Sequence, residues 1–211
     1  MNKGFNRQYC TLYIVRHGET EWNLERRLQG QRDSPLTKNG VTQAASLGIA
    51  LKNIKFDAIY ASDLLRAKRT AEIVSLERKL AVKTTDLLRE HNYGRYEGKK
   101  IAEVKDELKD AFDEYDRLSD QEKFRYQLIP NAETDEEIAI RFITFIREIA
   151  VLYKGKNVLV VSHGGIMSAF LVRIGFGIQE KIRIANAGYF KLLSDGIDFT
   201  VKETVGINSI K

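Results

Sequence analysis

Short apolar runs alternate along this chain with segments whose apolar residues recur every three or four positions. The run NVLVVS (157–162) has the continuous apolar character of a strand buried on both faces, and LYIV (12–15) is a similar four-residue core. Between them, residues 138–152 have the spacing of an amphipathic helix, and the preceding TDEE (134–137) has the form of a capping box. Such strands in alternation with helices predict an α/β fold: a three-layer α/β/α sandwich with a mostly parallel central sheet.

The same patterns predict the remaining elements. Further strands are expected at 57–62, 82–88, 189–193 and 199–205. Further helices are expected from Thr37 to Leu51, from Ser62 to Val74, from Ile101 to Leu118 and from Gly165 onward, with Thr37 and Ser62 as N-caps. No linker rich in serine, glycine or proline interrupts the chain, so residues 1–211 are predicted to form a single domain with a short extension over about residues 1–9.

Composition excludes several classes of protein. The 211 residues are 43% hydrophobic and 30% charged, which is ordinary for a globular chain and unlike a disordered one. No run approaches the roughly 20 apolar residues of a spanning helix, and the first residues lack the apolar core of a secretory signal. The single cysteine, Cys10, cannot form an internal disulfide and is expected to be a core residue. A cytoplasmic location with no membrane partner is therefore expected.

The net charge of +5 is spread along the chain. Its densest basic stretches, Arg26-Arg27 and Lys99-Lys100, are pairs, and residues 105–117 mix both signs in the manner of a solvated helix face. This modest surplus fits an anionic small molecule, and no nucleic-acid partner is expected.

Two of the three histidines occupy matching positions. Val15-Arg16-His17-Gly18 and Val161-Ser162-His163-Gly164 each follow a predicted strand. Groups just beyond the carboxyl ends of parallel strands line the ligand crevice of an open α/β sheet, so the two histidines are expected to converge on one ligand. A lone histidine is more often a satisfied or exposed residue, but two in the same context argue against coincidence. No third histidine or carboxylate cluster with metal-ligand spacing lies nearby, and no metal is expected.

Arg16 and Arg66 indicate that this ligand is an anion. The planar guanidinium group matches phosphate oxygens and stays charged at any working pH. Arg66 lies in the first turn of a predicted helix, where free backbone N–H groups also favour anions.

Five segments resemble, in the same order, the motifs of the histidine phosphatase superfamily, also called the phosphoglycerate mutase-like family. They are RHGETEWN (16–23), LQGQRDSPLT (28–37), SDLLRAKRTA (62–71), LLREHNYGRYEG (87–98) and VLVVSHGG (158–165). By this resemblance, His17 is the nucleophile that becomes phosphorylated, and Glu90 is the general acid and base. Residues that hold the phosphoryl group are then Arg16, Arg66 and His163, with further phosphate contacts from Asn23, Gln29, Gly30 and Gly164. The resemblance implies no cofactor.

Departures from the family pattern favour its phosphatase branch. His91 follows Glu90 where the mutase branch has an arginine that grips the substrate carboxylate, and residues 99–130 lack the proline-rich cover of that branch. The sequence therefore predicts a metal-independent phosphatase of small phosphorylated metabolites, with 99–130 as the variable segment over the substrate. A phosphoglycerate mutase is the alternative, and a non-catalytic phosphate-binding protein is a third. The substrate, the oligomeric state (monomer or homodimer) and the roles of Glu133 and His91 stay open. For His91, packing is the favoured interpretation and a position facing the substrate is the alternative.

Overall fold

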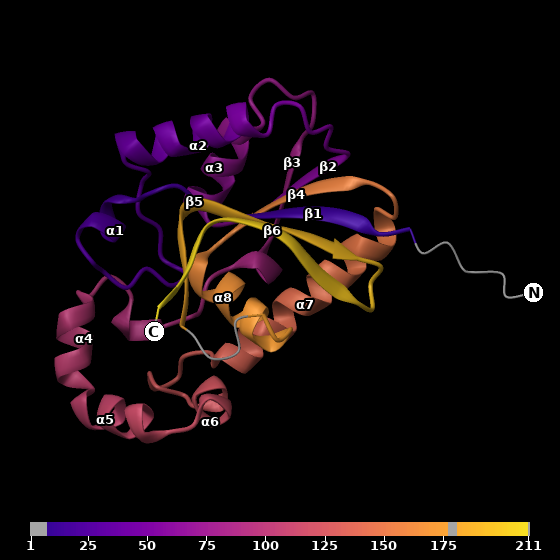
Figure 1. Ribbon diagram of the computed structural model, residues 1–211. Helices are drawn as coiled ribbons and strands as arrows, with labels where there is room; N and C mark the ends of the chain where they lie inside the picture. The colour runs from indigo at the N-terminus through magenta and orange to yellow at the C-terminus, as the bar shows by residue number, and fades with distance from the viewer. Residues whose placement is uncertain (1–7, 177–180, 211) are drawn as a thin grey trace, which may run out of the picture.

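The computed structural model describes residues 8–176 and 181–210, and within these ranges six strands form one sheet in the order β3-β2-β4-β1-β5-β6 (Figure 1). The strands are β1 (Cys10–Arg16), β2 (Ala58–Ser62), β3 (Val82–Thr85), β4 (Asn157–Ser162), β5 (Lys181–Ser194) and β6 (Phe199–Ile210). Strands β1 to β4 pair in parallel, whereas β5 and β6 extend the sheet in antiparallel fashion. The predicted mostly parallel sheet is confirmed.

Helices cover both faces of this sheet (Figure 1). Helices α2 (Lys38–Ala50) and α3 (Leu65–Val74) lie on one face, and α7 (Asp135–Leu152) and α8 (Gly164–Arg173) lie on the other. The short elements are α1 (Glu21–Leu24), α4 (Ile101–Glu107), α5 (Lys109–Arg117), α6 (Asp120–Arg125) and the 3-10 turns η1 (Asp86–Leu88) and η2 (Gly94–Tyr96). In the described ranges, no helix combines the length and apolar character needed to cross a membrane.

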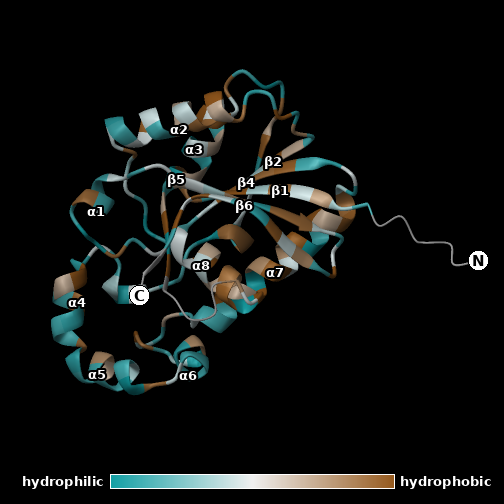
Figure 2. Cartoon of the chain, in the orientation of Figure 1, coloured by the Kyte–Doolittle hydropathy of each residue, from teal (hydrophilic) through white to brown (hydrophobic). Residues whose placement is uncertain are grey.

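Strand β4 shows why its sequence is apolar throughout. Val158 and Val160 point into the core that lies against α7 and α8, whereas Leu159 and Val161 point into the core under α2 and α3. All four side chains are fully buried. A strand covered on both faces cannot alternate apolar and polar residues, so the predicted double burial is confirmed. In Figure 2 the sheet carries hydrophobic stretches coloured brown, while α5 and α6 are mostly hydrophilic.

The predicted N-caps are correct at two helices and wrong at a third. Thr37 accepts a hydrogen bond from the amide of Gly40 at 2.9 Å, and Thr134 closes a capping box at the start of α7. Ser62, however, is the last residue of β2. Helix α3 begins later, after Leu64, whose side chain makes no cap hydrogen bond. Its first amides are instead satisfied from a distant loop, which the local sequence does not reveal.

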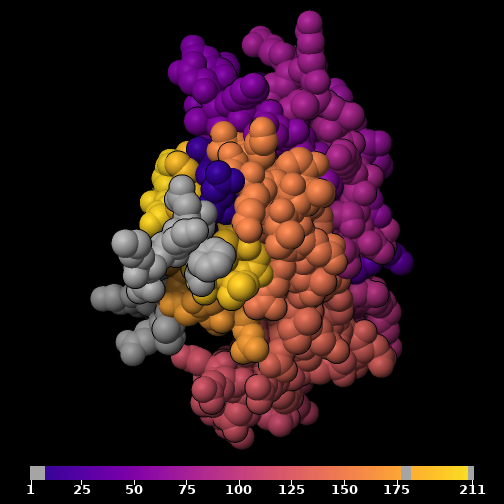
Figure 3. Space-filling view, turned by 90° about the vertical axis from the view of Figure 1, so that its right-hand side faces the viewer, coloured from indigo at the N-terminus to yellow at the C-terminus, as the bar shows by residue number. Residues whose placement is uncertain are grey.

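The single helix predicted from Ile101 to Leu118 is also wrong. The backbone leaves helical geometry at Leu108, with φ −111° and ψ 28°, and this separates α4 from α5. Periodicity alone did not detect the break because apolar spacing continues across it. Helices α4 to α6 form an outlying arm over residues 101–125, visible below α7 in Figures 1 and 3. The region 82–88 also differs from prediction, since β3 ends at Thr85 and a 3-10 turn follows.

Candidate active site

The two histidines lie side by side at the carboxyl edge of the sheet. Strand β1 pairs with β4 so that Arg16 lies opposite Ser162. The residue that follows each of these strands is a histidine. The amide of His17 donates to the carbonyl of Ser162 at 3.0 Å. The rings of His17 and His163 have centroids 5.2 Å apart and are 3% and 0% exposed. The parallel register therefore brings together the two histidines that the sequence singled out.

Two arginines, the buried Arg66 and the partly buried Arg16, lie beside them and are anchored by backbone carbonyls. Arg16 Nη1 donates to the carbonyl of Ile184 at 2.6 Å. Arg66 Nη2 donates to Gly30 at 2.6 Å, and its Nη1 donates to Arg32 at 2.7 Å. Burial lowers the pKa of both guanidinium groups, with nearby charges adding to or opposing that effect. An arginine stays protonated despite such a shift, so two fixed positive charges lie at this edge.

Unpartnered polar atoms gather at these predicted residues. Among the described residues, the buried side-chain nitrogens and oxygens without a hydrogen-bond partner are Nε of Arg16, Nε of Arg66, Oε1 of Gln29 and both ring nitrogens of His163. A buried polar group left unpaired costs about 1–3 kcal/mol, and such groups are uncommon in folded proteins. Their concentration on residues of one site indicates a surface shaped for a polar ligand, and the two arginines make an anion the best fit.

His17 is held as a neutral ring. Burial lowers its pKa well below the usual value, the charges of Arg66 and Arg16 lower it further, and the bond to Gly18 opposes them only in part. Its Nδ1 lies 2.7 Å from the carbonyl oxygen of Gly18, which only accepts hydrogen bonds. We therefore assign the proton to Nδ1, which leaves a lone pair on Nε2. The pKa of His163 is also lowered well below its usual value, mainly by burial and by Arg66.

Gly18 is required for close packing behind His17. A Cβ atom at this position would lie 2.5 Å from the carbonyl oxygen of Gly40, and such contacts are essentially never seen. The amide of Gly18 donates to Oγ1 of Thr70 in α3 at 3.0 Å. These contacts tie the loop after β1 to α2 and α3, so the backbone that carries His17 is fixed from two sides.

Glu90 is bound at the N-terminus of α8. Its Oε2 accepts from the amide of Gly165 at 2.8 Å, and its Oε1 accepts from the amides of Ile166 and His91, both at 3.0 Å. Burial raises the pKa of this carboxyl group, but the hydrogen bond and charge of His91 and the hydrogen bond from Gly165 outweigh burial and bring it well below its usual value. Glu90 is therefore an ionised carboxylate in the free site.

Asn23 is linked to the backbone of His17 through Asn186. The Nδ2 of Asn186 donates to Oδ1 of Asn23 at 3.1 Å and to the carbonyl of His17 at 3.2 Å. The same Oδ1 accepts from the amide of Thr20, which closes the capping box of α1. The side-chain oxygen of Asn23 is thus committed to structure, and any contact with phosphate must come from its amide nitrogen.

The predicted phosphate-binding glycines lie against the arginines. Gly30 has φ +55°, a left-handed conformation that favours glycine, and its carbonyl oxygen is occupied by Arg66. A Cβ atom on Gly164 would lie 3.1 Å from Nε of Arg16. Gly164 therefore allows the guanidinium group of Arg16 to approach the backbone closely, whereas a Cβ atom on Gly30 would meet the side chain of Glu97.

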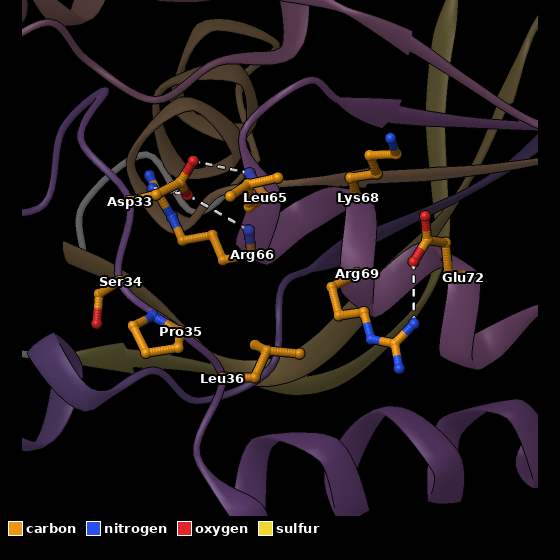
Figure 4. Close-up of a pocket in the computed structure, with 9 residues that line it drawn as sticks. All are labelled: Asp33, Ser34, Pro35, Leu36, Leu65, Arg66, Lys68, Arg69 and Glu72. Carbon is orange, nitrogen blue, oxygen red and sulfur yellow. Dashed lines mark hydrogen bonds and ion pairs between the residues drawn. The ribbon is translucent and has the colours of Figure 1, made fainter.

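Asp33 is a site residue that the sequence did not indicate. Its carboxylate accepts from the amides of Leu65 and Arg66 at 2.8 and 3.3 Å, and it pairs with Arg66 Nη1 at 3.1 Å (Figure 4). It therefore caps α3 in place of Ser62 and orients a buried arginine. A pocket of about 470 Å³ beside this contact is lined by Asp33, Ser34, Pro35, Leu36, Leu65, Arg66, Lys68, Arg69 and Glu72.

His91 stacks on Tyr93, with centroids 5.1 Å apart and planes 13° apart, as expected of a packing aromatic. That description is incomplete, because both of its ring nitrogens also contact carboxylates, one from Glu90 and the other from Asp135. The sequence indicates Asp135 only as part of the capping box TDEE (134–137). Glu133 has a structural partner, since it pairs with Arg141 at 3.1 Å.

Two neutral histidines, two anchored arginines and an ionised glutamate at one sheet edge define a protein built to hold a small anion beside a nucleophilic ring. The sequence pattern of the histidine phosphatase superfamily (branch 1) matches residues 12–205, and the chain belongs to this family of enzymes.

Its relatives include both phosphatases and mutases. The chain is 35% identical over 176 residues to "Uncharacterized phosphatase PhoE" of Bacillus subtilis, a match that covers 82% of this chain and 83% of the relative. It is 32% identical over 192 residues to "Probable phosphoglycerate mutase GpmB" of Salmonella choleraesuis, with 86% and 83% covered. The crystal structure of phosphoglycerate mutase from Bacillus anthracis superposes with a TM-score of 0.84 at 33% identity, covering 95% of this chain and 94% of that one.

Proposed function

We propose that this protein is a metal-independent phosphatase that hydrolyses phosphomonoesters of small metabolites through a phosphohistidine on His17. The observation that carries the proposal is the neutral ring of His17, with its Nε2 lone pair, next to two arginines whose buried Nε atoms have no hydrogen-bond partner. In the described ranges, no group of three or more His, Cys, Asp or Glu side chains is arranged to hold a metal ion. The charge of a phosphoryl group is instead met by Arg16, Arg66 and His163.

The first step transfers the phosphoryl group to the protein. A bound phosphate dianion raises the pKa of Glu90, so that this carboxyl group is protonated before the reaction. Nε2 of His17 attacks phosphorus, the bond from phosphorus to the ester oxygen breaks, and the departing oxygen takes the proton from Glu90. Arg16 and Arg66 are already fixed by carbonyl oxygens, so they stabilise the charge of the loose transition state without reorganising. The low pKa of His17 suits this role because a protonated ring has no lone pair with which to attack.

The second step hydrolyses the phosphohistidine. Glu90 is left as a carboxylate after the alcohol departs, and it removes a proton from the attacking water. The new bond joins the water oxygen to phosphorus, the bond to Nε2 breaks, and inorganic phosphate leaves with His17 neutral again. The amides of Gly165 and Ile166 hold the carboxylate in one place for both steps.

His91 favours hydrolysis over transfer to a second substrate hydroxyl. The mutase branch is expected to have an arginine at this position that grips a carboxylate of the substrate. The His91 ring is 8% exposed and both of its nitrogens contact carboxylates of this chain, so it is not free to bind another. A phosphoglycerate mutase is the second candidate, favoured by the similarity to relatives named as mutases.

The fate of a labelled phosphoenzyme separates the two candidates. The protein is labelled with a ³²P-phosphomonoester and divided into two portions. One is quenched to confirm acid-labile label on His17, and the other is mixed, still active, with 3-phosphoglycerate. Release of inorganic phosphate is expected, whereas efficient formation of bisphosphoglycerate would assign the protein to the mutases. His17→Ala is the control, and it must carry no label. A panel of phosphometabolites ranked by kcat/KM then identifies the substrate.

A further inference from the structure

His91 lies between two carboxylates in the interior of the protein. Its Nδ1 is 3.1 Å from Oε1 of Glu90, and its Nε2 is 2.9 Å from Oδ1 of Asp135, which lies in the first turn of α7. An ionised carboxylate only accepts hydrogen bonds, so each ring nitrogen must carry a proton to make both contacts. The geometry therefore requires an imidazolium ion. Burial lowers the pKa of His91, but its bonds to Asp135 and Glu90 outweigh burial and raise it to about 9.

Charged and titratable groups surround this ring on several sides. Tyr93 stacks on one ring face, and burial with the neighbouring carboxylates raises the pKa of its hydroxyl well above the usual value. A cavity of about 120 Å³ that includes His91 is also lined by groups from α5, α6, the segment between α6 and α7, and the start of α7. Among them are Tyr115, Lys123, Tyr126, Glu133 and Asp135. Lys123 is the cation in this set, and it lies over the ring of Tyr115, 5.5 Å from its centroid. Two carboxylates in direct contact outweigh this cation, which makes the protonated ring the favoured state.

The proposed reaction needs a proton at a place where the free site has none. Glu90 must protonate the departing alcohol, yet it is ionised and all of its hydrogen-bond partners are N–H groups. A phosphate dianion next to Glu90 raises the pKa of the carboxyl group, because two negative charges repel. One of the donors on Glu90 is the Nδ1–H of His91, and unlike a backbone amide it can release its proton.

We propose that His91 stores the proton that Glu90 uses, and that Asp135 holds His91 in position to supply it. When the phosphomonoester binds, the Nδ1 proton moves to Oε1 of Glu90, and the neutral ring keeps its Nε2–H directed to Asp135. Glu90 then gives this proton to the alcohol. It takes another from the attacking water and returns it to Nδ1 when phosphate leaves, so each turnover restores the starting state. His91 is thus a positioning residue that acts through Glu90, and the proposal rests on the function proposed above.

Nuclear magnetic resonance tests the stored proton without any turnover. The chain has three histidines, so replacing each in turn assigns every ring in a ¹⁵N spectrum. At pH 7.5 we expect imidazolium shifts for His91 and neutral shifts for His17 and His163. Saturating inorganic phosphate is expected to move the His91 shifts toward the neutral form. A neutral His91 in the free protein, or an imidazolium signal that phosphate leaves unchanged, would overturn the proposal even if the protein is a phosphatase.

Kinetics of His91→Asn then test the use of the proton. An alkyl phosphate needs a proton on its leaving group, so kcat/KM at pH 8 should fall by roughly 10²-fold, and an activated aryl phosphate should lose less than about tenfold. The alkaline limb of kcat/KM for the alkyl ester, expected near the His91 pKa of about 9, should move to lower pH because only Glu90 is left to hold the proton. Equal losses on both esters with an unmoved limb would show that His91 only supports the fold.

Asp135→Asn provides the second variant, with a matched control in the same helix turn. Loss of the Asp135 charge should lower the pKa of His91 and shift the alkaline limb in the same direction by a smaller amount. Glu136→Gln is the control, because Glu136 pairs with Arg125, and it should leave the limb in place. A shift in the control as large as that in Asp135→Asn would refute the role assigned to Asp135.

Discussion

Replacing Asp33 tests whether a distant loop both caps α3 and fixes its buried arginine. The side chain of Arg66 is 1% exposed and that of Asp33 is 26% exposed, so their ion pair is shielded mainly on the arginine side. Removing a partner from a buried pair costs about 3–5 kcal/mol. The loss here should be smaller, because Arg66 keeps two carbonyl acceptors. Losing a cap adds about 1 kcal/mol. We therefore expect Asp33→Ala to lower the free energy of unfolding by about 3 kcal/mol.

Asp33→Asn separates the two contributions. The amide oxygen can still accept from the helix, but it carries no charge, so a loss of about 2 kcal/mol is expected. With a urea m-value of about 2 kcal/mol/M, the alanine and asparagine variants should shift the unfolding midpoint by about 1.5 M and about 1 M. KM should rise in both, since Arg66 becomes less firmly held.

The more exposed pair of Asp63 and Arg89 provides the control. Their side chains are 30% and 36% exposed, so Asp63→Asn should cost at most about 1 kcal/mol. If Asp33→Asn and Asp63→Asn lower the urea midpoint equally, the assigned role of Asp33 is refuted.

Three further predictions concern the site. Because the folded-state pKa of His91 is raised from 6.5 to about 9, its contribution to stability is fully present below pH 6.5 and is lost as pH rises through 9. Urea unfolding of wild type and His91→Asn is compared at pH 6 and pH 10. Between these two pH values, the free energy of unfolding of wild type should fall by about 3 kcal/mol more than that of the variant. A Cβ on Gly165 would lie 2.5 Å from Oε1 of Glu90, so Gly165→Ala should displace this carboxylate and lower kcat for an alkyl phosphate by about 10²-fold. An unchanged kcat would contradict the position assigned to Glu90. Phosphate release should persist in excess EDTA and stop with vanadate, and activity lost to the chelator and restored by Mg²⁺ or Zn²⁺ would contradict the proposed chemistry.

The sequence alone determined the architecture and the central group of site residues. Local patterns determined them: an apolar run such as 157–162 must be covered on both faces, and a parallel sheet carries the residues after its strands to one edge. The positions of His17 and His163 follow from this rule without knowledge of any side-chain contact. The roles assigned to them, by contrast, came from the family motifs.

Only the tertiary structure decided how these residues are held and charged. Asp33 contacts the start of α3 from a loop 32 residues earlier in the chain. Asp135 contacts His91 although the two residues are 44 positions apart. Contacts between distant segments leave no periodic pattern in the sequence, so the sequence indicates Ser62 as the cap of α3, whereas the structure has Asp33 in that role. The pKa values also depend on the three-dimensional surroundings. Burial and the neighbouring arginines lower the pKa of His17 and His163, whereas the two carboxylates that flank His91 raise its pKa.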